Sequence, residues 1–163
     1  MQVAEELREA VEEGFRSLVR LTDHASAVRP APDKWSPKEV IGHLIDSATN
    51  NHGRFVRAQL QEELIFQGYA QDEWVVVQRY QDARWPSLLS LWRELNLHIA
   101  HVMERSSDHE LTRPRRRHNL HHLAWQTVPE NETTTLEYFM KDYVRHLQHH
   151  LGQIGITTEG SAS

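Results

Sequence analysis

Three histidines stand within five positions near the C-terminal end of the chain, in the segment DYVRHLQHHLGQIG of residues 142–155. Imidazole nitrogens bind divalent metals and carry protons near neutral pH, so this cluster is a candidate for metal-dependent chemistry. His146 and His150 have the spacing that places two side chains over the same turn of an α-helix. The pair therefore fits two ligands of one ion, although such a pair is a weak signal in a chain with 12 histidines.

The segment around this pair has the apolar periodicity of an amphipathic helix. His146 and His150 flank its apolar stripe, whereas His149 points away from the stripe and is expected to face water. The stripe consists of Leu136, Phe139, Met140, Tyr143, Leu147, Leu151 and Ile154.

The ends of this helix are also marked in the sequence. It should open at TTLE, where Thr134 and Glu137 can form a capping box, and it should stop at Gly155.

A third ligand is expected from a facing helix, and a second helix start is well marked. In SPKE, Ser36 suits the N-cap, Pro37 the first helical position and Glu39 the third. On the predicted helix His43 lies beyond one edge of the apolar stripe, and His52 lies on the opposite edge. Helical angle alone therefore does not choose between these two histidines.

His43 shares its side of that helix with polar residues, namely Asp46, Ser47, Asn50 and Arg54. A solvent-facing stripe would produce the same pattern. Asp46 could orient His43 or accept a hydrogen bond from water at a metal, or it could be an ordinary surface residue. Arg54 could pair with a substrate carboxylate, but a solvated arginine is the favoured interpretation. Tyr143 could direct its hydroxyl at a metal, or it could be a plain core residue.

Composition limits the other possibilities. The chain has 163 residues, 39% hydrophobic and 25% charged, which suits one soluble domain. It has no cysteine, which excludes disulfides, a thiol nucleophile and thiolate metal ligands. The net charge of -5 argues against broad nucleic-acid binding. No apolar run is long enough for a membrane span, and Met1 precedes an acidic stretch, so a cytoplasmic location is expected.

Four predicted helices can position the histidines. We expect a single all-α domain over residues 1–155, a four-helix bundle with long crossover loops, followed by a flexible tail over 156–163. WVVV in the second connection has no visible partner strand and is interpreted as extended packing. The predicted helices cover 2–22, 37–61, 86–105 and 134–155, and the segment 106–131 is expected to be a polar loop.

Two further features stand in that loop. The run RPRRRH, residues 113–118, is basic and is interpreted as solvated rather than as an anion site. His121 and His122 follow it and could shield a metal, but their position on an uncertain loop leaves them unplaced.

Two segments together resemble the DinB/YfiT-like superfamily of metal-binding four-helix bundles. They are KWSPKEVIGHLIDSATNNHGRFVRA and TLEYFMKDYVRHLQHHLGQI, and the resemblance extends over most of the chain, up to Ile154. It implies a divalent metal held by His43, His146 and His150, an up-down-down-up helix order and a homodimer. Zinc or nickel is the expected ion, with iron and manganese as alternatives, because all four accept imidazole.

The resemblance also implies two competing functions. Relatives include mycothiol- and bacillithiol-dependent transferases and isomerases, and many are described as metal-dependent hydrolases. Three histidine ligands leave coordination positions open, which favours an enzyme acting on a small molecule, and a low-molecular-weight thiol is the candidate cosubstrate. The alternative is a non-catalytic metal-binding or stress-response protein with a structural ion.

Overall fold

The computed structural model describes residues 1–156, and within them the chain is helical, with only isolated bridges between extended residues. The expected all-α four-helix bundle is confirmed. The long helices are α1 (Gln2–Leu18), α3 (Pro37–Ala58), α5 (Trp85–Arg105) and α8 (Leu136–Gln153). The short ones are α2 (Asp23–Ser26), α4 (Gln71–Gln78), the 3-10 turn η1 (Tyr80–Asp82), α6 (Asp108–Thr112) and α7 (Leu120–Leu123).

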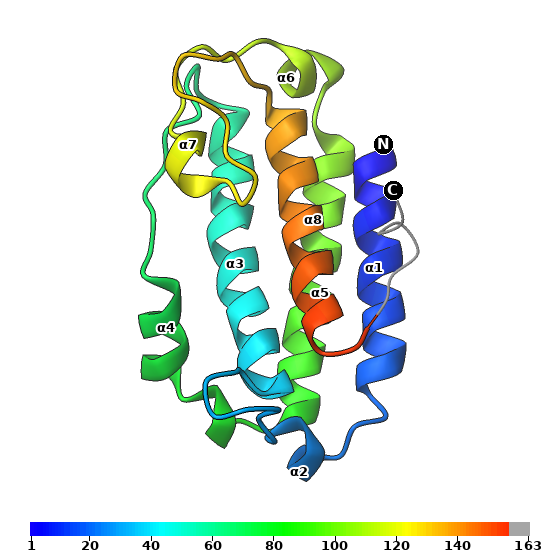
Figure 1. The fold of residues 1–163 in the computed structure, drawn as a ribbon. Coiled ribbons are helices and arrows are strands. Elements are labelled where there is room, and N and C mark those ends of the chain that lie inside the picture. Colours follow the sequence, from blue (N-terminus) through cyan, green and yellow to red (C-terminus); the bar gives the residue numbers. More distant parts are fainter. Residues whose placement is uncertain (157–163) are drawn as a thin grey trace.

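The four long helices lie side by side as one bundle (Figure 1). α3 and α1 each pack against both α5 and α8. In Figure 1, α1 and α8 run downwards while α3 and α5 run upwards, so the connection from α3 to α5 returns along the length of the bundle. This arrangement places α3 directly against α8, the two helices that carry the candidate ligands. Within residues 1–156, no helix combines the length and the apolar character needed to cross a lipid bilayer.

The start of α3 is fixed by the capping box that its sequence predicts. Ser36 Oγ accepts a hydrogen bond from the Glu39 amide at 3.3 Å, and Glu39 Oε2 accepts one from the Ser36 amide at 2.9 Å. Pro37 occupies the first turn, and Arg29 pairs with the Glu39 carboxylate. These contacts set the register of α3, and His43 follows Glu39 at the next turn of the helix.

Several helix ends differ from the predicted ones. α1 ends at Leu18 rather than near Thr22, because the Thr22 hydroxyl accepts from the Ala25 amide and caps the separate helix α2. The cap of α8 is Thr135, whose hydroxyl accepts from the Tyr138 amide at 3.1 Å, so the expected role of Thr134 was wrong by one residue.

The other end of α8 follows the prediction. Gly155 has a φ of 80° and its amide donates to Gly152 O, while the Ile156 amide donates to Leu151 O at 3.0 Å. This pair of bonds is the Schellman motif, which requires the left-handed conformation that glycine adopts without strain. The tail predicted to be flexible lies outside the described residues from position 157 onward.

The basic run of residues 113–118 contains a buried arginine that holds other segments together, so its interpretation as a solvated loop was wrong. Arg115 is 1% exposed and donates to the carbonyl oxygens of Ala58 and Gln61 at 3.1 and 2.7 Å. It also pairs with Glu110 at 2.9 Å. A buried guanidinium thus satisfies carbonyls that the end of α3 leaves free, and α3 ends at Ala58 rather than near Gln61.

The WVVV segment is helical, so its interpretation as extended packing was wrong. It forms half of α4, which packs against α3 and buries Val75. Side chains just after it hold the segment to α3: Gln78 Nε2 and the Tyr80 hydroxyl both donate to Asp46 Oδ1, at 2.7 and 2.6 Å. Strand propensity in a short run yields to such tertiary contacts when no partner strand exists.

Candidate metal centre

Three histidines from two helices meet inside the bundle. His43 extends from α3, and His146 and His150 extend from successive turns of α8. His146 Nε2 lies 3.3 Å from His43 Nε2 and 3.0 Å from His150 Nε2. One possible ligand atom from each residue lies within 4.8 Å of the other two. The structure therefore brings together the three histidines singled out in the sequence.

These distances fit a single ion. Zinc binds imidazole nitrogen at about 2.0–2.1 Å, so tetrahedral angles separate two such nitrogens by roughly 3.3 Å. A hydrogen bond joins only two of the three converging nitrogens, whereas one metal cation can bind all three. His43, His146 and His150 thus have the donor type and the spacing that a divalent metal requires.

The protonation of the rings also suits metal binding. Burial, with a smaller contribution from the charge of His150, lowers the pKa of His43 to about 3. Burial and the neighbouring imidazoles lower the pKa of His146 to about 3 as well, and burial lowers that of His150. All three rings are therefore neutral at pH 7, and a neutral imidazole has the lone pair that binds a metal.

Gln153 fixes the tautomer of one ring. His150 Nδ1 lies 2.8 Å from Gln153 Oε1, an oxygen that can only accept, so the proton is on Nδ1. Nε2 of the same ring then presents its lone pair to the centre. His43 Nδ1 is buried and has no hydrogen-bond partner among the described residues, so the protein leaves that ring without an orienting acceptor.

Two tryptophans lie close to the histidines of α3 and α8. The Trp35 ring is 5.1 Å from the His43 ring and 6.4 Å from the His150 ring. Trp125 is 6.5 Å from His146 and 5.0 Å from His149, measured between ring centroids. His149 is exposed, as expected, and lies outside the cluster of three.

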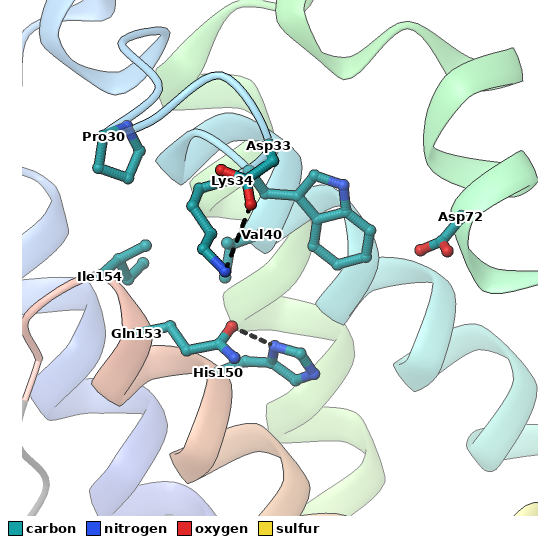
Figure 2. A pocket seen from close by; sticks show the side chains of 9 residues that line it. Pro30, Asp33, Lys34, Val40, Asp72, His150, Gln153 and Ile154 are labelled. Carbon is teal, nitrogen blue, oxygen red and sulfur yellow. Dashed lines mark hydrogen bonds and ion pairs between the residues drawn. The ribbon is translucent and has the colours of Figure 1, made fainter.

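The centre opens onto two cavities. One of about 350 Å³ lies beside α8 and is lined by His146 and His150, with Arg54, Tyr69 and Asp142 among its other walls. A second of about 620 Å³ also reaches His150. Figure 2 shows this second cavity between the loop that carries Asp33 and Lys34 and the end of α8, where Gln153 is bonded to His150.

The Asp46 carboxylate forms no hydrogen bond with any of the three histidines. It is buried, and its Oδ1 accepts from Gln78 and Tyr80. Gly42 makes room for this contact, because a Cβ there would come within 2.1 Å of the Tyr80 ring. Asp46 thus anchors the α4 segment to α3, and neither of the two alternatives weighed for it anticipated this.

Arg54 does not lie on the surface, and the Tyr143 hydroxyl is bonded to α5 rather than directed at a metal. Arg54 is 4% exposed, so the favoured interpretation as a solvated arginine was wrong. Tyr143 is buried, and its hydroxyl donates to Asn96 Oδ1 of α5 at 2.5 Å, which fits the core interpretation.

Several residues of the site were missed or unplaced by sequence reasoning. Trp35, Trp125 and Gln153 touch the cluster, and His122 of α7 lines the smaller cavity. Trp35 and Gln153 both stand in the two segments that carry the family resemblance, but neither was given a role. His52 instead lies against His98, with ring centroids 5.0 Å apart.

A four-helix bundle with convergent histidines beside a cavity is an arrangement that helical metalloproteins use. The family model of the DinB superfamily matches residues 5–154, and the chain belongs to that superfamily. No curated protein matches the chain.

Two solved structures share the fold. YfiT from Bacillus subtilis, described as a probable metal-dependent hydrolase with an unusual four-helix bundle topology, is 22% identical, with a TM-score of 0.75 over 94% of this chain and 82% of its own. A mycothiol-dependent maleylpyruvate isomerase is 12% identical, with a TM-score of 0.70 over 96% of this chain. The chain spans 61% of that isomerase.

Proposed function

We propose that this protein is a metal-dependent enzyme that acts on a small molecule at the centre formed by His43, His146 and His150. The observation that carries the proposal is the convergence of three neutral imidazoles at the wall of a cavity of about 350 Å³. Bound there, a divalent ion supplies Lewis acidity that activates water or a thiol as a nucleophile near neutral pH.

The chain's own residues have distinct roles in this proposal. Three histidines contribute no negative charge, so the centre favours an anionic nucleophile or substrate group. Gln153 holds the His150 ring in the tautomer that directs Nε2 inward. Trp35 packs against two of the rings and lines the larger cavity beside His150. Because the chain has no cysteine, any thiol in the reaction comes from a cosubstrate.

The cavity weighs against the non-catalytic alternative. A structural metal site is closed by protein ligands, usually four. Within residues 1–156, only these three histidines form a group with metal-ligand spacing, and two of them line a space that admits a small molecule. The likeness to a probable metal-dependent hydrolase and to a mycothiol-dependent isomerase adds support for an enzyme, of either reaction class.

The test begins with metal content. Protein purified without a His tag is analysed for metals beside His146→Ala and His149→Ala. We expect about one ion per chain in wild type and in His149→Ala, and little in His146→Ala, because only His146 belongs to the cluster. Similar losses in both variants would contradict the assignment.

Activity is then screened with the ion that is found. Ester and amide substrates test hydrolysis, and low-molecular-weight thiols with an electrophilic acceptor test thiol transfer. Turnover that requires the ion and disappears in His146→Ala would support the enzyme. A full complement of metal with no turnover in either screen would favour the structural ion.

A further inference from the structure

Arg54 is a buried cation with no counter-ion in the part of the chain that the structure describes, and it lines the cavity beside the metal centre. Its side chain donates to Asn51 Oδ1 at 3.3 Å and to the carbonyl oxygen of Gln67 at 2.8 Å. A guanidinium has five N–H groups, so these two bonds leave three without an acceptor among residues 1–156. No carboxylate within the described part of the chain forms an ion pair with it.

The other buried arginine shows what a purely structural guanidinium looks like in this protein. Arg115 pairs with the Glu110 carboxylate and donates to carbonyl oxygens of Ala58, Gln61 and Glu62. Its charge is therefore balanced by a carboxylate, although its buried Nε has no hydrogen-bond partner among the described residues. Arg54 is buried to a similar degree but lacks the carboxylate, and burying an unpaired charge is costly.

Among the described residues, no carboxylate in the cavity wall forms an ion pair with Arg54. Asp142, which also lines the cavity, accepts backbone hydrogen bonds on both oxygens, from Trp125 at 2.9 Å and Gln126 at 2.8 Å. Tyr69 lies near Arg54, but burial raises the pKa of its hydroxyl to about 12, so it is neutral at pH 7. An anion that enters the cavity would thus meet an uncompensated guanidinium.

Arg54 and the metal centre lie along one face of α3. Eleven residues separate His43 from Arg54, which is close to three full turns and about 16 Å between Cα atoms. The side chains of Ser47 and Asn51 line the cavity between them. Because helical side chains lean towards the N-terminus, the long arginine side chain reaches back towards His43, which leaves a span on the order of 10 Å.

We propose that Arg54 binds the carboxylate of an elongated organic anion whose opposite, reacting end lies at the three-histidine centre. This inference rests on the proposed function and adds a substrate class to it. A single guanidinium balances one negative charge and matches a carboxylate with two parallel hydrogen bonds. The polar wall formed by Ser47 and Asn51 suits a chain that carries hydrogen-bonding groups.

The test uses protein loaded with cobalt(II) and simple thiols as probes, because thiolate binding to cobalt produces a near-ultraviolet absorption band. Mercaptohexanoate, whose sulfur and carboxylate lie roughly 9 Å apart when extended, is compared with the uncharged mercaptohexanol. We expect wild type to bind the carboxylate about tenfold more tightly. Arg54→Gln should bind both thiols equally, and Arg54→Lys should retain part of the preference.

The matched control is Arg57→Gln, which removes the same charge from the exposed side of α3. It should keep the wild-type preference. The ratio of the two affinities is the decisive quantity, since a loss of packing at Arg54 weakens both thiols alike and leaves the ratio unchanged.

A second measurement needs no variant. Mercaptoacetate is too short to span the two groups, so wild type should bind it no more tightly than mercaptoethanol. Equal binding of mercaptohexanoate and mercaptohexanol, or an undiminished preference in Arg54→Gln, would overturn the inference and leave the proposed function standing. Absence of a thiolate band with every thiol would overturn both.

Discussion

At the residue scale, the centre depends on which nitrogen of each imidazole carries the proton. Gln153 settles this for His150 by accepting a hydrogen bond from Nδ1 at 2.8 Å. His43 has no such partner among the described residues, although its Nδ1 is buried. The three rings are thus not equivalent, and His150 is the one whose orientation is built into the surrounding protein.

We expect Gln153→Ala to bind zinc about tenfold more weakly than wild type, because outer hydrogen bonds of this kind typically contribute at least that factor. Gln153→Glu should retain wild-type affinity, since a carboxylate oxygen also accepts from Nδ1. Competition with a chelating dye measures the affinities. Gln148→Ala on the same helix is the control and should bind like wild type; equal affinity of Gln153→Ala and wild type would contradict the role given to this bond.

At the element scale, the predictions succeeded where signals are local. The capping box at Ser36 and Glu39 and the glycine stop at Gly155 depend on a few neighbouring residues, and both were found. The end of α3 depends instead on Arg115, more than fifty positions away, and α4 depends on contacts with Asp46. Such long-range contacts have no periodic signature, so the sequence could not reveal them.

The start of α3 should give the protein a specific acid sensitivity. Burial raises the pKa of the Glu39 carboxyl, but hydrogen bonds from Arg29 and Ser36 outweigh burial and hold it below its usual range. A carboxylate with a depressed folded pKa stabilises the fold above its unfolded pKa, about 4.3, and loses that contribution as pH falls through the folded pKa.

Glu39→Gln should therefore lower the free energy of unfolding at pH 7 by about 1–2 kcal/mol. The difference from wild type should shrink as pH falls below about 4.3 and through the lowered folded pKa of Glu39, below which the carboxyl is protonated in both states. Urea unfolding at several pH values measures it. Glu9→Gln, an equal charge change at an exposed position of α1, should run parallel to wild type; a gap for Glu39→Gln that stays constant with pH would argue against an ionised capping residue.

At the scale of the whole molecule, the candidate site joins parts of the chain that are distant in sequence. Helical angle placed His146 and His150 together, but it left His43 and His52 undecided, because the choice depends on how α3 is rotated against α8. The family resemblance pointed to His43, and His43 is the residue that meets the pair. Trp125 and parts of the walls of both cavities come from the segments between the long helices, which sequence patterns do not position.

Because the three histidines come from α3 and α8, a bound ion should stabilise the entire bundle. Binding to the folded state alone adds about 2.7 kcal/mol at an ion concentration a hundredfold above Kd. For a domain of this size that raises Tm by roughly 5–10 °C. Differential scanning calorimetry of chelator-treated wild type, with and without zinc, measures the shift.

His146→Ala should show no such shift with zinc, while His149→Ala should match wild type, because His149 lies outside the cluster. The comparison separates a specific site from the general affinity of a chain with 12 histidines, since loosely bound ions also bind the unfolded chain and do not raise Tm. An equal zinc-dependent rise in His146→Ala would place the stabilising ion elsewhere. A rise that is lost with His146 would mean that the ion bridges α3 and α8, so that metal occupancy and the stability of the fold are coupled.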